Sequence, residues 1–170
     1  GNFFTEAKKE FTALSTTYKN LAANGTVTDL GYLQEFEAVD SSVKSVVYTT
    51  SGTDFNDIRL NIADGQTVLV NFTASEVHFL EGGVRINGDN ADTWLREHST
   101  SVIFNFPNAT KITIGGTSLY GVFLAPKATV VPTGWGGNIC GTTICEKIDG
   151  NGGGFELHLG LGELKKDDLP

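Results

Sequence analysis

Residues 101–131, SVIFNFPNATKITIGGTSLYGVFLAPKATVV, contain the pattern that decides the fold. Three short apolar bursts, at residues 102–104, 112–114 and 122–124, alternate with connections rich in Pro, Asn and Gly. β-branched and aromatic residues bounded in this way are typical of strands and turns. The bursts recur about every ten residues, a spacing that fits both a meander of antiparallel hairpins and a solenoid of stacked parallel strands.

The residues of this stretch resemble one family closely. Phe-Asn-Phe-Pro, then alternating Thr and Ile, then Leu-Ala-Pro-Lys-Ala-Thr are similar to the choice-of-anchor A domain, an adhesive module of microbial surface proteins. The similarity continues through residues 68–71, 83–88 and 152–158, and covers about residues 55–159. The resemblance implies a parallel β-helix, that is, an ice-binding-protein-like β-solenoid of stacked short strands flanked by one long helix.

An amphipathic helix is predicted near the N-terminus, over residues 3–23. Apolar side chains recur there in steps of three and four, at Phe4, Ala7, Phe11, Leu14, Tyr18 and Leu21. This spacing places one apolar stripe along a helix. We expect the stripe to pack on the domain's own sheet, since three heptads are short for a coiled-coil partner. The predicted fold class is therefore mainly β, with one long flanking amphipathic α-helix.

The composition fits a single turn-rich β domain. The 170 residues include 21 glycines, and 39% of the residues are hydrophobic, which is enough for one core. We expect one adhesin-type β-solenoid domain over residues 1–162, followed by a charged tail or the start of a linker at 163–170. The formal net charge of −8 disfavours nucleic acid as a partner, and no apolar run is long enough for membrane insertion.

Cys140 and Cys145 are the only cysteines in the chain. Their spacing matches neither a CxxC redox pair nor a zinc site, so a disulfide or two free buried thiols remain. A fully extended segment would separate their Cα atoms by roughly 17 Å, beyond the reach of a disulfide, so residues 141–143 must turn if the two pair. If the protein is extracellular, we expect a disulfide between Cys140 and Cys145, because surface compartments oxidise paired thiols.

No catalytic residue or metal site is predicted. Glu156 and His158 would share one face of a strand, but no Ser or Cys nucleophile is evident near them, so we expect a structural role. His78, His98 and His158 lack the close spacing that gathers zinc ligands. The Gly-rich segments 134–137 and 150–154 contain neither GxGxxG nor a Walker lysine and are expected to form turns.

Three Asn-x-Thr sequences match the N-glycosylation acceptor, at Asn24, Asn71 and Asn108. The acceptor matters only in a eukaryotic source. Asn71 lies inside a continuous apolar run that is expected to be a strand buried on both faces. Burial argues against its modification.

The predicted ligand-binding residues are Asp89, Asp92, Trp94, Arg96, His98 and Trp135. The only two tryptophans lie in polar or Gly-rich connections, and an aromatic side chain on a loop of a rigid scaffold commonly offers apolar surface to a sugar ring or a protein pocket. Arg96 and His98 would add donors, while Asp89 and Asp92 would add acceptors or bind calcium; no other cofactor is expected. The alternative is that the tryptophans cap the solenoid core. Relative to the family pattern, residues 94–99 are a local elaboration.

The resemblance implies a secreted, cell-surface adhesion module without catalysis. Its ligand would be a host or environmental protein or glycan, and the domain would belong to a longer multidomain surface protein, anchored to the cell wall through another part. One alternative is a protein that binds ice or a crystal surface through spaced hydroxyls, with candidates at Thr110, Thr113 and Thr117. A second is a polysaccharide-acting β-helix enzyme, for which the nearest carboxylate set is Asp54 and Asp57 with Arg59.

Overall fold

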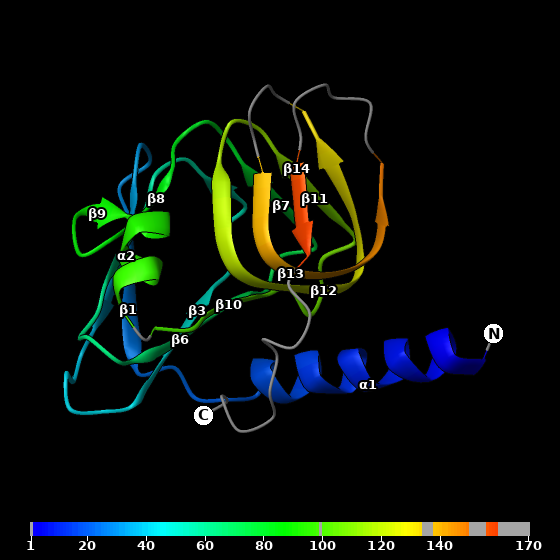
Figure 1. The fold of residues 1–170 in the computed structure, drawn as a ribbon, viewed down its shortest axis with the longest axis horizontal. Helices are drawn as coiled ribbons and strands as arrows, with labels where there is room; N and C mark the ends of the chain where they lie inside the picture. The colour runs from blue at the N-terminus through cyan, green and yellow to red at the C-terminus, as the bar shows by residue number, and fades with distance from the viewer. Residues whose placement is uncertain (1, 99, 134–137, 150–155, 160–170) are drawn as a thin grey trace.

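The computed structural model describes residues 2–98, 100–133, 138–149 and 156–159. In this part of the chain, short strands stack into a β-solenoid of about 5 turns, with one long helix beside them (Figure 1). Neighbouring turns pair in parallel; for example, Val46 pairs with Val68, and Val68 pairs with Val102. This pairing confirms the predicted solenoid over the meander, in which consecutive strands would be antiparallel.

We number the turns as coils 1 to 5 and call their three sides faces A, B and C. Face A holds β2 (Gln34–Ala38), β5 (Ile58–Asn61) and β8 (Val84–Ile86). Face B holds β3 (Ser45–Thr50), β6 (Thr67–Phe72) and β10 (Val102–Asn105). Face C holds β4 (Asp54–Phe55), β7 (Glu76–Phe79) and β11 (Lys111–Ile114). Coils 4 and 5 are the long strands β12 (Ser118–Pro132) and β13 (Asn138–Ile148), and β14 (Glu156–Leu159) pairs with the start of β13.

Two further strands extend the hydrogen-bonded sheet formed by β2, β5 and β8 on face A. β1 (Gly25–Asp29) pairs in antiparallel with β2, and β9 (Asp89–Asn90) pairs in antiparallel with β8. The order along face A is therefore β1-β2-β5-β8-β9. β1 is the end strand of this face at the side of coil 1.

Two stacked glycines let coils 4 and 5 turn from face A to face B. Gly121 pairs with Gly141, and their φ angles are 121° and 122°. A Cβ atom on Gly121 would lie 2.3 Å from the carbonyl oxygen of Val102, and one on Gly141 would lie 2.0 Å from that of Gly121. Both positions therefore require glycine. A register shift between Ala125 and Thr129 then turns the chain from β10 on face B to β11 on face C.

The inward side chains of the three faces form one hydrophobic core. Phenylalanine rings pack through its middle: those of Phe72 and Phe106 lie 4.7 Å apart and nearly parallel, and Phe106 also contacts Phe79 and Phe123. Aromatic pairs of this kind stabilise a core beyond their area burial. Each apolar burst of the sequence supplies the inward residues of one strand, so the bursts recur as the chain winds.

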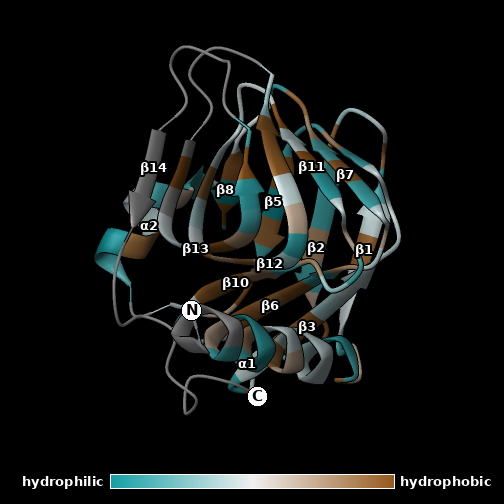
Figure 2. Ribbon diagram, turned by 90° about the vertical axis from the view of Figure 1, so that its right-hand side faces the viewer, coloured by the Kyte–Doolittle hydropathy of each residue, from teal (hydrophilic) through white to brown (hydrophobic). Residues whose placement is uncertain are grey.

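A second, smaller core lies outside face B, between its strands and helix α1 (Asn2–Lys19). Outward apolar side chains of β3, β6, β10 and β12 meet Tyr18 there, and Phe11, Leu14 and Leu21 pack against them. Figure 2 shows α1 directly below these strands. The amphipathic helix and its packing on the domain's own sheet are confirmed, while the side chain of Phe4 lies outside the described residues.

Polar contacts fix the register of α1 against the coils. Asn71 of coil 2 donates from Nδ2 to the carbonyl oxygen of Tyr18 (2.9 Å), and Asn105 of coil 3 donates to that of Ser15 (3.0 Å). Lys8 forms an ion pair with Glu146 of coil 5. The ten residues from Lys8 to Tyr18 rise about 15 Å, close to the ~14 Å across three coil spacings. One turn of the helix therefore matches one coil.

The predicted disulfide between Cys140 and Cys145 is corrected by the structure, in which Cys145 is a free, half-buried cysteine. From Cys140, opposite Tyr120, to Cys145, opposite Ala125, each residue of β13 pairs with one of β12. The chain bends only at the Gly141 corner, and residues 141–144 stay paired with β12, so the tight turn that would bring the two sulfur atoms together is absent. The side-chain placement of Cys140 lies outside the described residues.

Candidate functional site

The longest excursion from the solenoid lies in coil 3. The chain takes 22 residues from Val46 to its partner Val68, but 34 residues from Val68 to its partner Val102. The extra length forms β9 and helix α2 (Ala91–Glu97). We call residues 87–98 the coil-3 projection; its elements lie at the left of Figure 1, away from coils 4 and 5. Residues 94–98 of the predicted elaboration belong to this projection, and residue 99 lies outside the described residues.

The base of the projection is a tight turn between β8 and β9. Asn87 and Gly88 both adopt positive φ, 51° and 84°, as the turn of a two-residue hairpin requires. The Asn87 side chain accepts a hydrogen bond from the Ile62 N–H (2.8 Å) and donates one to the Ile62 carbonyl (2.7 Å), which fixes the turn to coil 2. Asn90 then caps α2 by accepting from the Asp92 N–H (2.9 Å).

Trp94 lies inside this projection and not on its surface. Its side chain is only 9% exposed and belongs to the main core, and Nε1 donates to Oγ1 of Thr100 (3.3 Å). The His98 ring stacks on the indole, with centroids 3.6 Å apart and planes within 6°. This burial agrees with the alternative that a tryptophan caps the solenoid core, because α2 turns the Trp94 side chain inward, and ligand binding by Trp94 stays a prediction. Trp135 lies outside the described residues.

The polar residues predicted for ligand binding do gather on the projection. Arg96 pairs with Asp92 one helical turn away (Nη2 to Oδ2, 2.6 Å), and 71% of the Arg96 side chain is exposed. Asp89 is exposed on β9, and His98 is half-buried over Trp94. The guanidinium keeps donors free beyond those used by one carboxylate, because it has five N–H groups. The projection can therefore bind hydrogen-bond acceptors and anions.

Calcium at Asp89 and Asp92 stays a prediction. The carboxylate of Asp92 is engaged by Arg96. Among the described residues, no three His, Cys, Asp or Glu side chains converge on one point.

The three solenoid faces differ in what they present. Face B is covered by α1. Charged side chains line up outside face A, at Glu35, Arg59 and Arg85, and outside face C, at Glu76, Lys111 and Lys147. The predicted hydroxyl candidates do not form a ladder, because Thr117 is buried and Thr113 hydrogen-bonds to His78 (2.6 Å).

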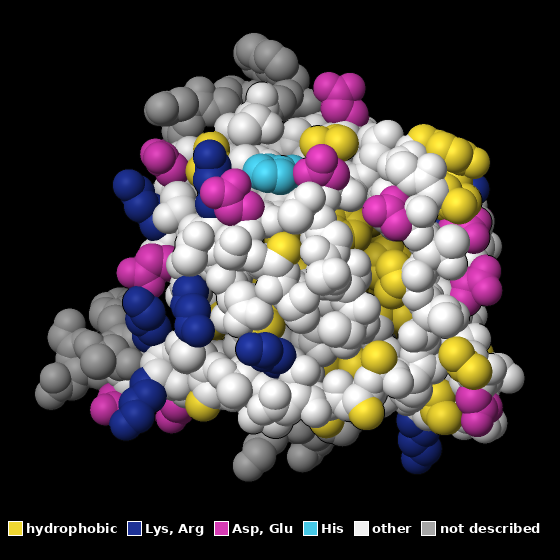
Figure 3. Space-filling model, turned by 180° about the vertical axis from the view of Figure 1, so that it is seen from behind, with side chains coloured by type: hydrophobic (Ala, Val, Ile, Leu, Met, Phe, Trp, Pro, Cys, Tyr) yellow, Lys and Arg dark blue, Asp and Glu magenta, His cyan; other side chains and the backbone are white. Residues whose placement is uncertain are grey.

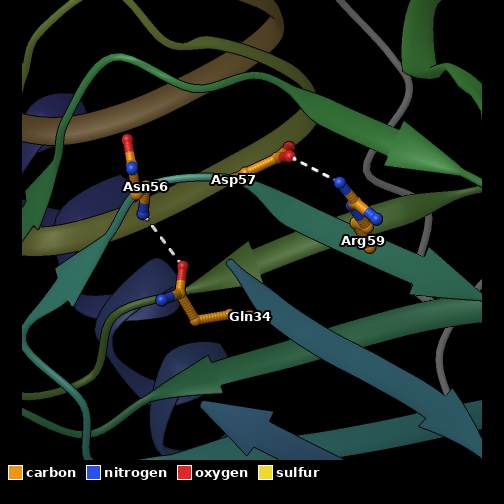
Figure 4. A network of polar contacts seen from close by, with 4 residues as sticks. All are labelled: Gln34, Asn56, Asp57 and Arg59. Carbon is orange, nitrogen blue, oxygen red and sulfur yellow. Dashed lines mark hydrogen bonds and ion pairs between the residues drawn. The ribbon is translucent and has the colours of Figure 1, made fainter. Parts of the chain in front are cut away.

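The carboxylates proposed for an enzyme lie on different faces. Asp57 follows β4 at the corner with face A, where it pairs with Arg59 (3.2 Å) beside a hydrogen bond from the Asn56 N–H to Gln34 (2.9 Å), as Figure 4 shows. Asp54 lies on β4 in register with His78. The Asp57 carboxylate is thus held by a neighbouring cation. The side chains of Glu156 and His158 lie outside the described residues, although both belong to β14.

Comparisons with known proteins give one match. A family model described as a "Putative Ice-binding-like adhesive domain" matches residues 2–158, so the likeness includes α1 and all five coils. No curated protein and no solved structure matches the chain. No helix in the described part of the chain is both long and apolar enough to cross a membrane. The chain therefore belongs to the family of ice-binding-like adhesive domains.

Proposed function

We propose that this domain is a non-catalytic adhesion module of a secreted, cell-surface protein, and that it binds an extracellular protein or glycan through the coil-3 projection. The observation that carries the proposal is the 34-residue span of coil 3, which places Asp89, Asp92 and Arg96 outside an otherwise regular solenoid. Binding residues are commonly held in this way, on a connection supported by a rigid scaffold. The module would sit in a longer protein that another part anchors to the cell wall.

The contacts of the projection indicate how it would bind. The Asn87 turn and the α2 cap fix its backbone, so little ordering entropy would be lost on binding. Trp94 supports the His98 ring from below and serves as a positioning residue. Arg96, Asp92 and His98 would make the polar contacts, and Asp89 would add an acceptor or, with Asp92, a calcium site.

Binding to ice or to a crystal surface is the second candidate function, and the charged side chains on faces A and C make it less favoured than adhesion. A lattice-matching surface needs a flat array of similar groups, whereas the exposed faces A and C carry rows of charged side chains that hold their own water. A polysaccharide-acting enzyme is the third candidate, and Asp54 and Asp57 do not form a pair on one face.

The test begins with a glycan array and a panel of extracellular matrix proteins, each probed with calcium and with EDTA. Arg96→Ala should weaken binding to any hit by roughly fivefold or more, a loss of about 1 kcal/mol. Arg59→Ala is the matched control, because Arg59 also forms an exposed pair with a nearby Asp, but on face A. Equal effects of the two variants, ice-growth inhibition, or substrate turnover would contradict the proposal.

A further inference from the structure

The end strand β1 presents an open edge at the coil-1 end of face A. Among the described strands, β1 pairs with β2 alone. The Leu30 N–H donates to the Leu33 carbonyl (2.9 Å), and the Gln34 N–H donates to the Asp57 carbonyl, away from β1 (2.8 Å). Since ladder bonds alternate along an antiparallel pair, the N–H and C=O groups of residues 25, 27 and 29 point away from β2. They form a row of backbone donors and acceptors that no described strand uses.

The neighbouring end strand, β3, is closed by contrast. The side chain of Asn24 accepts a hydrogen bond from the Val47 N–H (2.6 Å) and donates one to the Ser45 carbonyl (3.0 Å). The Asn24 N–H also donates to the Val47 carbonyl (3.0 Å). β1, with the sequence GTVTD, has no Lys, Pro or bulge of the kind that usually blocks an edge. The fold therefore protects one end strand and leaves the other open.

Exposed apolar side chains flank the open edge. Leu30 and Tyr32, 48% and 68% exposed, lie at the turn between β1 and β2. Val39, 72% exposed, follows Ala38, the partner of Gly25 at the other end of the hairpin. They are three of the four large hydrophobic side chains exposed in the described part of the chain. These exposed apolar side chains therefore lie at both ends of the β1–β2 hairpin, on either side of the open edge.

The same end of the solenoid is acidic. Residues 20–43 contain Asp29, Glu35, Glu37 and Asp40 but no Lys or Arg. Hydrogen bonds from Gln34 and from the Gly31 N–H lower the pKa of Asp29, so its carboxylate stays charged at neutral pH. In the view from behind, most hydrophobic side chains lie at the centre and right and most Lys and Arg on the left, whereas Asp and Glu occur on both sides (Figure 3).

We propose that the open edge of β1 binds an extended, Lys- or Arg-rich segment of a partner protein by strand addition. The backbone of Val27 would pair with that segment, as main-chain bonds do whenever a peptide extends a sheet. On the outer face, Thr26 and Thr28 stand in register with Glu37 and Glu35. A cationic side chain beside either threonine would be two strand spacings, about 10 Å, from a glutamate, and long Lys or Arg side chains reach across much of that distance. This surface is separate from the coil-3 projection.

The first test uses the peptide Thr-Lys-Val-Lys-Thr-Lys-Val and two controls, one with Glu in place of each Lys and one with Pro in place of the first Val and of the second Thr. Binding is measured by fluorescence anisotropy at about 0.15 M salt, where distant charges are screened. The Lys peptide should bind at least about tenfold more tightly than either control. Amide hydrogen exchange should slow at Val27 and its neighbours. Equal binding of the Pro peptide, or protection away from β1, would refute the proposal.

The second test changes the protein. Glu35→Lys with Glu37→Lys should weaken the Lys peptide about tenfold or more, because the reversed charges lie beside the added strand. Glu10→Lys with Asp64→Lys makes the same charge change at exposed sites on α1 and coil 2, and it should leave affinity within about twofold because of screening. Circular dichroism confirms folding of both variants. If the two double variants weakened binding of the Lys peptide equally, the attraction would be a diffuse effect of net charge, and the proposed site at β1 would be contradicted.

Discussion

Asn105 donates a hydrogen bond from Nδ2 to Oδ1 of Asn71, its neighbour in the preceding coil, at 2.8 Å. Both side chains are fully buried beneath α1, and Asn105 also accepts from Oγ of Ser15 (2.7 Å). Asn105→Ala should lower the free energy of unfolding by about 2–3 kcal/mol, because it leaves buried partners unsatisfied. Urea unfolding measures the change, with the exposed Asn61→Ala as control. A loss no larger than that of the control would show that the asparagine pair is dispensable.

The apolar stripe of α1 provides a second prediction. Phe11 packs against the outer core of face B, whereas Ala13 is exposed on the same helix. Phe11→Asp should cost at least about 1.5–3 kcal/mol, the value of burying such a side chain. Ala13→Asp adds the same charge without removing that contact, and it should change the melting temperature little. An unchanged melting temperature for Phe11→Asp would mean that α1 is an appendage.

Alanine substitutions at three glycines should distinguish the stability cost of backbone strain from that of a steric clash. Gly83→Ala should be neutral, since its φ is ordinary and a Cβ there would meet nothing within 4 Å. Gly65→Ala, at a φ of 82° in open space, should cost about 1 kcal/mol. Gly121→Ala should cost more than both, because the new Cβ also meets the Val102 carbonyl. Thermal unfolding ranks the three variants, and a Gly121 variant as stable as the Gly65 variant would mean that the corner relaxes.

The cysteines provide a redox prediction. The unfolded protein without reductant should show two titratable thiols, because Cys140 and Cys145 stay in register with β12 on either side of the Gly141 corner and no tight turn brings them together. One titratable thiol or none would contradict this prediction and would favour a disulfide in the native protein.

Cys145 also gives a pH dependence. Burial raises the pKa of its thiol, and a backbone hydrogen bond at Lys147 partly offsets that rise. Reagents that react with the thiolate should therefore modify Cys145 more slowly in folded than in unfolded Cys140→Ser protein at pH 8. A raised folded-state pKa stabilises the fold below the ordinary thiol pKa. This contribution should fade as pH rises above about 8.5. The Cys140→Ser, Cys145→Ser double variant lacks the thiol and should not show that part of the decline. Equal reaction rates for folded and unfolded protein would place the thiol in solvent.

Local sequence patterns predicted where the helix and strands lie better than they predicted which strands pair. The three-and-four spacing of Phe11, Leu14 and Tyr18 was sufficient for α1 because one face of a helix depends only on sequence separation. The choice between meander and solenoid was different. It depends on pairing between residues 18 to 35 positions apart, such as Val68 and Val102, which periodicity alone does not encode. The family resemblance made that choice, and the parallel register confirms it.

The candidate site was predicted in part. The polar surface at Asp89 and Arg96 could be predicted because charged side chains usually stay in contact with water, while their binding of a ligand stays a prediction. The sequence left the orientation of Trp94 open between the surface and the core, because it depends on how α2 packs against the core, a tertiary contact. The open edge of β1 was missed, although the absence of Lys and Arg from residues 20–43 is a signal that the sequence contains.

Helix α1 runs along the stacked coils of the solenoid and connects several of them. It contacts coil 5 at Lys8, coil 3 at Ser15 and coil 2 at Tyr18, while Asn24 just beyond it holds coil 1. A pull along the solenoid axis must therefore detach the helix while it separates coils, so several contacts bear the load together. Resistance to force depends on the barrier to unfolding more than on equilibrium stability. Under tension, this arrangement delays the peeling of coils one at a time.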